Sequence, residues 1–292
     1  MRLIDQNKVT NNMKPRIVRN KIYKYIFLAA TTLCLIVLAV LFARVLKQGL
    51  PHLDWQFLTS TPSRKPEQAG VYSALIGTMW MMAVVIPVTF IIGVGAAIYL
   101  EEYAKKNKFT TFIETNISNL AGVPSVVYGL LGLTLFARAF ALGQSVLAAG
   151  LTMSLLVLPV IIVAAQEAIR AVPKEIREAS YGMGATKWTT IYKVVLPTAI
   201  PSILTGAILA ISRAIGETAP LVVLGIPLFL IQTPTSIFDS FTALPMQIYN
   251  WTGRPQAEFQ DIAAAGIIVL LALLILLNSI AVLIRNKFSK KF

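Results

Sequence analysis

The stretch QEAIRAVPKEIREASYGMGATKWTTIYKVVLPTAIP, residues 166–201, is a charged segment between two long apolar regions. Pro173 suits the first turn of a short helix, and Gly182 and Gly184 are residues that end one. Apolar side chains recur at helical spacing over 187–195. The pattern predicts two short helices that stand outside the apolar regions on either side.

The composition of the chain places those apolar regions in a membrane. The 292 residues are 56% hydrophobic and 13% charged, with a mean hydropathy of +0.71, whereas soluble domains carry roughly 25% charged residues. A membrane-spanning helix needs about 20 predominantly apolar residues. The uncharged windows predict an all-α integral membrane protein with six transmembrane helices, at about 23–46, 72–100, 116–136, 143–165, 199–230 and 262–284.

The basic residues predict how these helices are oriented. Most of the 26 Lys and Arg fall before the first helix, after the second, after the fourth and after the sixth. Cytoplasmic flanks carry such an excess, so both termini are expected in the cytoplasm of a multi-pass inner-membrane protein. The predicted parts are a basic cytoplasmic tail at 1–22, the first helix and its outer loop at 23–71, a transmembrane domain at 72–284 with its connecting loop at 166–198, and a cytoplasmic tail at 285–292.

The same charges argue against several functions. The net charge of +13 is dispersed over the cytoplasmic flanks, which membrane insertion explains without a nucleic-acid partner. One cysteine, Cys34, cannot form an intramolecular disulfide, and one histidine, His52, forms no metal-ligand pattern. The chain contains no phosphate-binding GxxxxGK[ST] loop. We therefore expect no catalytic residues, no metal and no bound cofactor in this chain.

Two opposite charges, Arg213 and Glu217, interrupt the fifth apolar region within SRAIGETAP, residues 212–220. A charge in the bilayer costs about 2.5–3.5 kcal/mol on insertion scales. Arg213 would lie roughly 20 Å along the fifth helix, at or beyond mid-membrane, with Glu217 on the same face. The pair either joins helices by mutual neutralisation or lines and gates an anion path, in which the planar guanidinium suits oxyanions.

Other polar residues in and beside the apolar regions are less specific. Ser125 and Tyr128 lie three residues apart and could line the same path, or could satisfy backbone groups near Pro124. Glu101 and Glu102 are interpreted as a solvated helix end at the cytoplasmic surface.

The connecting loop resembles the EAA signature of ABC-importer permeases, which reads E-A-A, three residues, G, nine residues, I-x-L-P. The matching residues are Glu178, Ala179, Gly184, Leu196 and Pro197. Ser180 replaces the second alanine and Val194 replaces the isoleucine, and both are mild changes in size. The resemblance implies a type I ABC importer permease fold whose loop holds a cytoplasmic coupling helix.

Three further stretches resemble the A-type permeases of phosphate importers, the PstA family. They are AAIYLEEYAKKN (96–107), NLAGVPSVVYGLLGL (119–133) and SRAIGETAPLVVLG (212–225). The resemblance implies a heterodimer with a C-type permease, a cytoplasmic ATPase dimer that holds ATP and magnesium, and an extracytoplasmic phosphate-binding protein. In such an assembly this chain forms half of the translocation path in the lipid bilayer.

Several alternatives stay open from the sequence. The substrate could be another oxyanion such as molybdate or sulfate, because an arginine alone does not distinguish these anions. The chain could also be a C-type phosphate permease. An ATP-independent channel or carrier is a separate class, against which the EAA-like loop argues, and no nucleophile, base or metal set supports a membrane-embedded enzyme.

Overall fold

A computed structural model describes residues 6–289, with side chains from 16 to 287, and every regular element in this range is helical. Five helices are long and apolar enough to cross a membrane, and a bent pair of helices makes a sixth span if it is counted as one. This confirms the predicted all-α membrane protein. Residues 1–5 and 290–292 of the two predicted tails lie outside the described residues.

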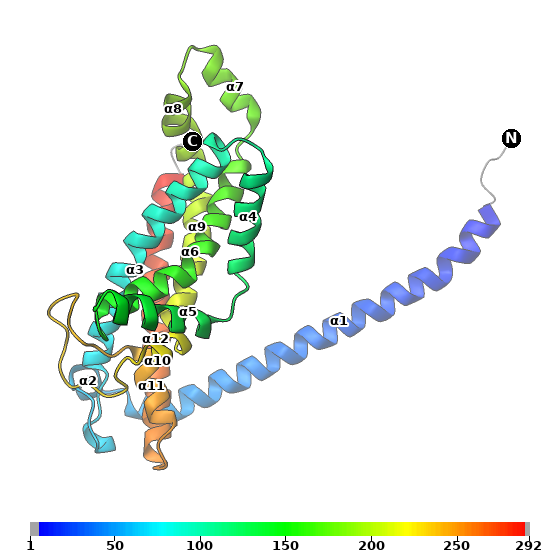
Figure 1. The fold of residues 1–292 in the computed structure, drawn as a ribbon. Coiled ribbons are helices and arrows are strands. Elements are labelled where there is room, and N and C mark those ends of the chain that lie inside the picture. Colours follow the sequence, from blue (N-terminus) through cyan, green and yellow to red (C-terminus); the bar gives the residue numbers. More distant parts are fainter. Residues whose placement is uncertain (1–5, 290–292) are drawn as a thin grey trace.

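The first half of the chain holds two long helices, a bent pair and several short elements (Figure 1). In order they are α1 (Gln6–Gly49), η1 (Leu50–His52), α2 (Trp55–Thr59), η2 (Pro66–Gln68), α3 (Tyr72–Ile98), the π-helical turn η3 (Tyr99–Tyr103), α4 (Lys108–Leu120), α5 (Ser125–Gly132) and the π-helical segment η4 (Leu133–Ala139).

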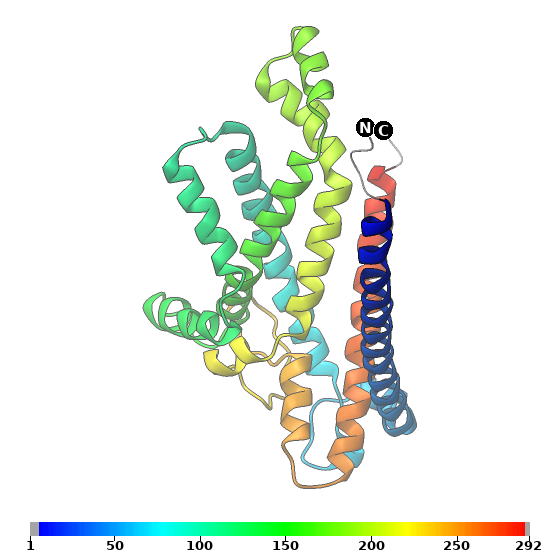
Figure 2. The same ribbon diagram turned by 90° about the vertical axis from the view of Figure 1, so that its right-hand side faces the viewer.

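The second half contains the other long helices and the connecting loop. In order they are α6 (Val146–Arg170), α7 (Lys174–Gly182), α8 (Lys187–Thr190), the π-helical turn η5 (Ile191–Val195), α9 (Leu196–Gly216), α10 (Ala219–Leu224), α11 (Leu244–Thr252) and α12 (Glu258–Ser289). Helices α7 and α8 stand at one end of the bundle, and α2 and α11 at the other (Figures 1 and 2).

Helices α3, α6 and α9 pack together as the centre of the bundle. Glycines on α3 allow close approach: a Cβ on Gly93 would lie 2.7 Å from Ile161 Cγ2 on α6. A Cβ on Gly77 would lie 2.0 Å from the Thr242 carbonyl oxygen. Thr78 on α3 then accepts the Leu244 N–H at 2.9 Å. These contacts fix the loop before α11 against the core.

Replacing Gly77 with alanine is expected to destabilise the protein, because the new methyl group would overlap a backbone carbonyl that cannot move alone. Overpacking of this kind costs about 1–3 kcal/mol. Gly95 on the same helix is the matched control, since a Cβ there would meet no atom within 4 Å in the part of the chain that the structure describes. Thermal unfolding in detergent should show a lower midpoint for Gly77→Ala and an unchanged or higher midpoint for Gly95→Ala. Equal midpoints would contradict the packing argument.

The third predicted span is not a single helix. The uncharged window predicts a continuous helix over 116–136, but α4 ends at Leu120 and α5 begins at Ser125, with a bend of 102° between them. The break falls on AGVP, residues 121–124. Proline disfavours helical geometry in the residue before it. Helix α5 therefore lies across the bundle rather than along it (Figure 2).

The fifth predicted span also ends early. The expected helix over 199–230 begins before Leu196, running on from α8 and η5, and stops at Gly216. Glu217 has extended backbone angles, with φ −74° and ψ 124°. The short α10 follows, and Gly225 ends it with φ +85°, a conformation that favours glycine.

Loop 226–243 follows α10 and connects it to α11 at the end of the bundle opposite α7. Asp239 organises this loop, because its carboxylate accepts the Thr235 N–H and the Thr235 hydroxyl, each at 2.8 Å, and the Ser236 N–H at 2.9 Å. These hydrogen bonds, that from the Thr235 N–H first, lower the pKa of Asp239 from its ordinary value. The carboxylate therefore stays ionised, and can accept these three hydrogen bonds, down to a lower pH than an aspartate with an ordinary pKa.

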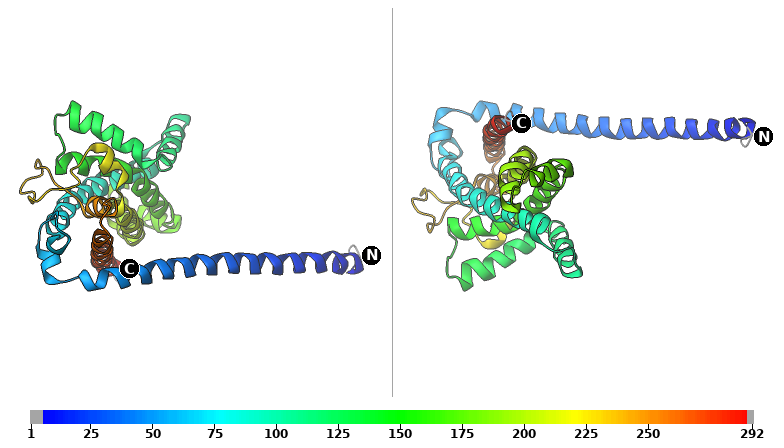
Figure 3. Two further views of the ribbon diagram at one scale, coloured as in Figure 1. Left: turned by 90° about the horizontal axis from the view of Figure 1, so that it is seen from below. Right: turned by 90° about the horizontal axis from the view of Figure 1, so that it is seen from above.

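Helix α1 contacts the bundle near its own carboxyl end, and the rest of this helix points away from the bundle. Its last turns pack on α12, while its side chains from Arg16 to Ala43 are exposed. Views along the bundle axis show the helix projecting away from the other helices (Figure 3). Its amino end and the carboxyl end of α12 point toward the end of the bundle that carries α7 (Figure 2).

Candidate functional site

The charged pair predicted inside the membrane is formed. Arg213 Nε donates to Glu217 Oε1 at 3.2 Å. Although Glu217 lies just beyond the end of α9 and not on the expected helix face, its side chain turns back toward the arginine. The Arg213 side chain is 63% exposed and that of Glu217 is 19% exposed. One edge of the guanidinium is thus fixed by the carboxylate, and the rest is open to a ligand.

Helix α12 provides a scale for the depth of this pair. Its uncharged segment runs from Asp261 to Arg285, about 36 Å along the helix axis. Ser212 Oγ lies 2.6 Å from Asn278 Oδ1, and Asn278 is about 10 Å along the axis from Arg285. On this scale Arg213 lies within the apolar segment and nearer its α7 end than its middle. The expected depth, at or beyond mid-membrane, stays a prediction.

The two broken spans meet next to this pair. Arg213 lines a small cavity together with Ala121, at the bend between α4 and α5, and with Leu156 on α6. A Cβ on Gly129 of α5 would lie 2.8 Å from the Pro220 carbonyl oxygen of α10. Irregular backbone at membrane depth is tolerated where it is buried in protein or lines a water-filled cavity. The site therefore combines a fixed cation with two interrupted helices.

Ser125 and Tyr128 differ in their surroundings. Tyr128 is buried, and its hydroxyl donates to the Leu120 carbonyl at 2.8 Å, just before the bend. This contact favours the structural interpretation of Tyr128, because it joins α5 to a carbonyl at the bend that also accepts the Val123 N–H at 3.0 Å. Ser125 is the first residue of α5 and is half-buried. Contact of either residue with a translocation path stays a prediction.

The connecting loop adopts the expected pair of short helices. Helix α7 ends at Gly182, and Gly184 has φ +82°, which a residue with a side chain rarely adopts. Glu178 and Ala179 are exposed on α7. Large apolar side chains beside them also face outward, with Met183 88% and Trp188 64% exposed. This end of the molecule presents a surface suited to a partner protein.

The second short helix joins the loop to the bundle. Ser180 Oγ on α7 lies 2.9 Å from Thr190 Oγ1 on α8, and both side chains are buried. Helix α8 runs through η5 into α9, where Leu196 and Pro197 form the first turn and are half-buried. The signature residues therefore divide into an exposed group on and after α7 and a packed group at the start of α9.

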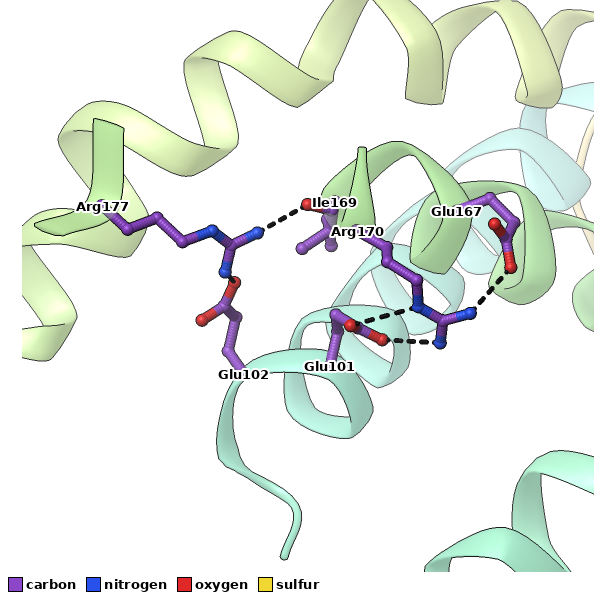
Figure 4. A network of polar contacts seen from close by, with 6 residues as sticks. All are labelled: Glu101, Glu102, Glu167, Ile169, Arg170 and Arg177. Carbon is purple, nitrogen blue, oxygen red and sulfur yellow. Dashed lines mark hydrogen bonds and ion pairs between the residues drawn. The ribbon is translucent and has the colours of Figure 1, made fainter. Parts of the chain in front are cut away.

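A network of ion pairs lies beneath α7 (Figure 4). Arg170 at the end of α6 contacts Glu101 of η3 through two hydrogen bonds, at 2.9 and 3.3 Å, and contacts Glu167 at 3.0 Å. Arg177 of α7 forms an ion pair with Glu102. The Glu102 side chain is 7% exposed. The interpretation of Glu101 and Glu102 as a solvated helix end is therefore wrong.

Sequence reasoning missed this network because its partners are far apart in the chain. Glu101 and Glu102 are separated from Arg170 and Arg177 by 69 and 75 residues. Lys105 and Lys106 offered nearer charges of the right sign. The one signal in the sequence was two adjacent carboxylates at the end of a long apolar helix.

The sequence of this chain is similar to those of known membrane transport permeases. Residues 89–291 match the family described as binding-protein-dependent transport system inner membrane component. The phosphate transport system permease protein PstA 1 of Mycobacterium tuberculosis (strain ATCC 25618 / H37Rv) is 34% identical over 278 residues, covering 92% of this chain and 88% of that protein. PstA of Mycobacterium leprae (strain TN) is 35% identical over 272 residues, covering 88% and 86%.

A shorter alignment and a solved structure extend the comparison. The probable ABC transporter permease protein YqgI of Bacillus subtilis (strain 168) is 37% identical over 185 residues, 63% of each chain, so this match spans just under two thirds of that relative. An inward-facing structure of the MetNI methionine ABC transporter (CY5 native crystal form) has a TM-score of 0.59 at 18% identity, over 75% of this chain and 97% of that one. The structural likeness shows the fold, that of a type I importer permease. The chain belongs to the family of binding-protein-dependent transport system inner membrane components.

Proposed function

We propose that this chain is the A-type permease subunit of an ATP-driven phosphate importer and forms half of its translocation path. The observation that carries the proposal is the Arg213–Glu217 pair, a fixed and partly open guanidinium inside the membrane. Guanidinium groups form paired hydrogen bonds with phosphate oxygens. Relatives that align over most of this chain are named as phosphate transport permeases, which supports phosphate over molybdate or sulfate.

The exposed end at α7 supports a separate ATPase as the source of energy. Glu178, Ala179 and Gly184 lie on or beside α7 with the exposed apolar residues, and an amphipathic helix of this kind fits a groove on a partner. A cytoplasmic ATPase dimer would dock here and carry ATP and magnesium. This assignment puts α7, the amino end of α1 and the carboxyl end of α12 in the cytoplasm.

The proposal includes two further partners. A C-type permease would complete the path, because a single chain leaves Arg213 open on one side. An extracytoplasmic phosphate-binding protein would deliver the anion to the end of the bundle that carries α2 and α11. Loop 226–243 and a polar cavity of about 740 Å³ lined by Thr61, Tyr72 and Asp239 lie at that end.

The proposed function is tested by uptake in proteoliposomes. The chain is co-expressed with the neighbouring permease and ATPase candidates, reconstituted with the binding protein, and supplied with labelled phosphate. Uptake is expected only when ATP is present on the ATPase side. Unlabelled phosphate should compete with the label, whereas molybdate and sulfate at equal concentration should not.

The same assay separates the alternatives. Competition by molybdate or sulfate as strong as that by phosphate would replace the substrate assignment. Uptake by the purified chain alone without nucleotide would show an ATP-independent channel or carrier and would overturn the proposal.

A further inference from the structure

Arg177 joins three segments at the α7 end of the bundle. It lies on α7, forms an ion pair with Glu102 of η3, and donates a hydrogen bond from Nη2 to the Ile169 carbonyl of α6 at 2.6 Å (Figure 4). The arginine side chain is 19% exposed and that of Glu102 is 7% exposed. Because η3 continues α3 directly, this contact connects the exposed helix α7 to the end of a central membrane helix.

The other contacts of α7 are with the segments that continue into α9. Helix α7 packs mainly against α8 and η5, and the buried Ser180–Thr190 hydrogen bond fixes it to the segment that becomes α9. A second contact reaches η3 from α8, where Lys187 Nζ lies 4.9 Å from the ring centre of Tyr103. That contact does not involve α7. Helix α7 therefore acts on α9 through packing, and the Arg177–Glu102 pair gives it a direct contact with the η3 end of α3, which α9 also reaches through the core.

The neighbouring ion pair has a different effect. Glu101 is bound by Arg170, which belongs to α6 and not to α7. This pair holds η3 against α6 whatever the position of α7. Of the two adjacent carboxylates on η3, Glu101 is thus bound by Arg170 of the central helix α6, and Glu102 is bound by Arg177 of the exposed helix α7. Of these two contacts, that of Glu102 depends on where α7 lies.

The Arg177 contact is incompletely satisfied. Its Nε is buried without a hydrogen-bond partner among the described residues. A buried donor without an acceptor is costly, so this arrangement is poorly optimised as a purely structural contact. It suits a junction that changes geometry when α7 moves.

We infer that Arg177 and Glu102 are positioning residues that make the inner end of α3 follow α7, so that nucleotide-driven movement of α7 acts on α3 and on α9 together. The inference rests on the proposed function, in which α7 docks on the ATPase. With the pair broken, α7 still docks and still moves α9, but the inner end of α3 follows only through its packing on α9 and α6, and fewer hydrolysis events produce transport.

The test uses the full transporter in proteoliposomes and measures ATP hydrolysed, phosphate taken up and ATPase co-purified. Glu102→Gln and Arg177→Gln are expected to retain the ATPase and at least about half of the hydrolysis, while phosphate taken up per ATP falls at least about fivefold. The double variant should be no worse than either single variant, as is typical of two residues that act through one contact. Arg177→Lys keeps the charge but loses the fork that reaches both Glu102 and Ile169, so it should give an intermediate ratio.

Glu167→Gln is the matched control. It removes a carboxylate from the same network, but that side chain is 65% exposed and does not contact α7, so its transport ratio should be unchanged. A normal ratio in both Glu102→Gln and Arg177→Lys would overturn the inference. So would a fall in uptake that only parallels loss of bound ATPase or of thermal stability, because a structural role predicts that result. Absence of ATP-driven phosphate uptake by the unaltered transporter would instead reject the proposed function.

Discussion

Arg213→Gln is expected to lower ATP-driven phosphate uptake by roughly ten- to a hundredfold while leaving assembly intact. A hydrogen bond to a charged group contributes about 1.5–3 kcal/mol, and about 1.4 kcal/mol corresponds to a tenfold change in an equilibrium constant. Glutamine keeps some hydrogen-bonding capacity but loses the charge and the planar fork. Arg213→Lys keeps the charge alone, so its uptake should fall between that of the glutamine variant and that of the unaltered protein.

The neighbouring residue provides the control for Arg213. Ser212→Ala removes the contact with Asn278 between α9 and α12 without touching the charged pair. It should lower thermal stability slightly and leave uptake per assembled complex unchanged. Normal uptake by both Arg213 variants at matched expression would remove this residue from the transport mechanism and leave mutual neutralisation with Glu217 as its role.

Gly184→Val is expected to abolish most transport without preventing membrane insertion. Gly184 has φ +82°, and the left-handed conformation costs a residue with a side chain roughly 1–2 kcal/mol. No atom of the described residues lies within 4 Å of a Cβ there, so the expected damage comes from backbone strain and from a new side chain in the proposed docking surface. Strain of this size lowers occupancy of the docking conformation about 5- to 30-fold.

A nearby glycine distinguishes strain from general sensitivity of the loop. A Cβ on Gly182 would also meet open space, but this residue has no positive φ, so Gly182→Ala should transport normally. Co-purification of the ATPase and phosphate-stimulated hydrolysis measure the effect. Retention of both by Gly184→Val would show that the ATPase does not dock on this loop.

The sequence predicted the membrane spans well wherever one uncharged window contained one helix. The helix around 262–284 is a clear case, because Asp261 and Arg285 bound an uncharged segment that lies wholly within α12 (Glu258–Ser289). The prediction failed where one window held two segments. Gly122 and Pro124 offered a local signal for the bend after α4, but uninterrupted hydropathy across 116–136 outweighed them.

The candidate site could be predicted only in part. Arg213 and Glu217 were identifiable because charge is costly in an apolar segment and the two residues are close in sequence. The ion pair between Glu102 and Arg177 depends on how α3, α6 and α7 pack together. The spacing of residues within one segment of the sequence does not predict that packing. The irregular backbone at Glu217 had a local signal, because Gly216 and Pro220 can both loosen a helix at this level, but neither residue fixes where the helix stops.

The contact between Arg285 and Thr205, at 3.3 Å, has a mechanical consequence. From this contact the continuous helix extends about 27 Å back to Lys187, and Val195, Ala199 and Ile203 along it belong to a core cluster with residues of α3 and α6. Pivoting at Thr205 by about 10° would displace the far tip by roughly 5 Å, nearly one helical turn. An arm of this length would turn a displacement at its α8 tip into a small rotation of the segment that carries Arg213.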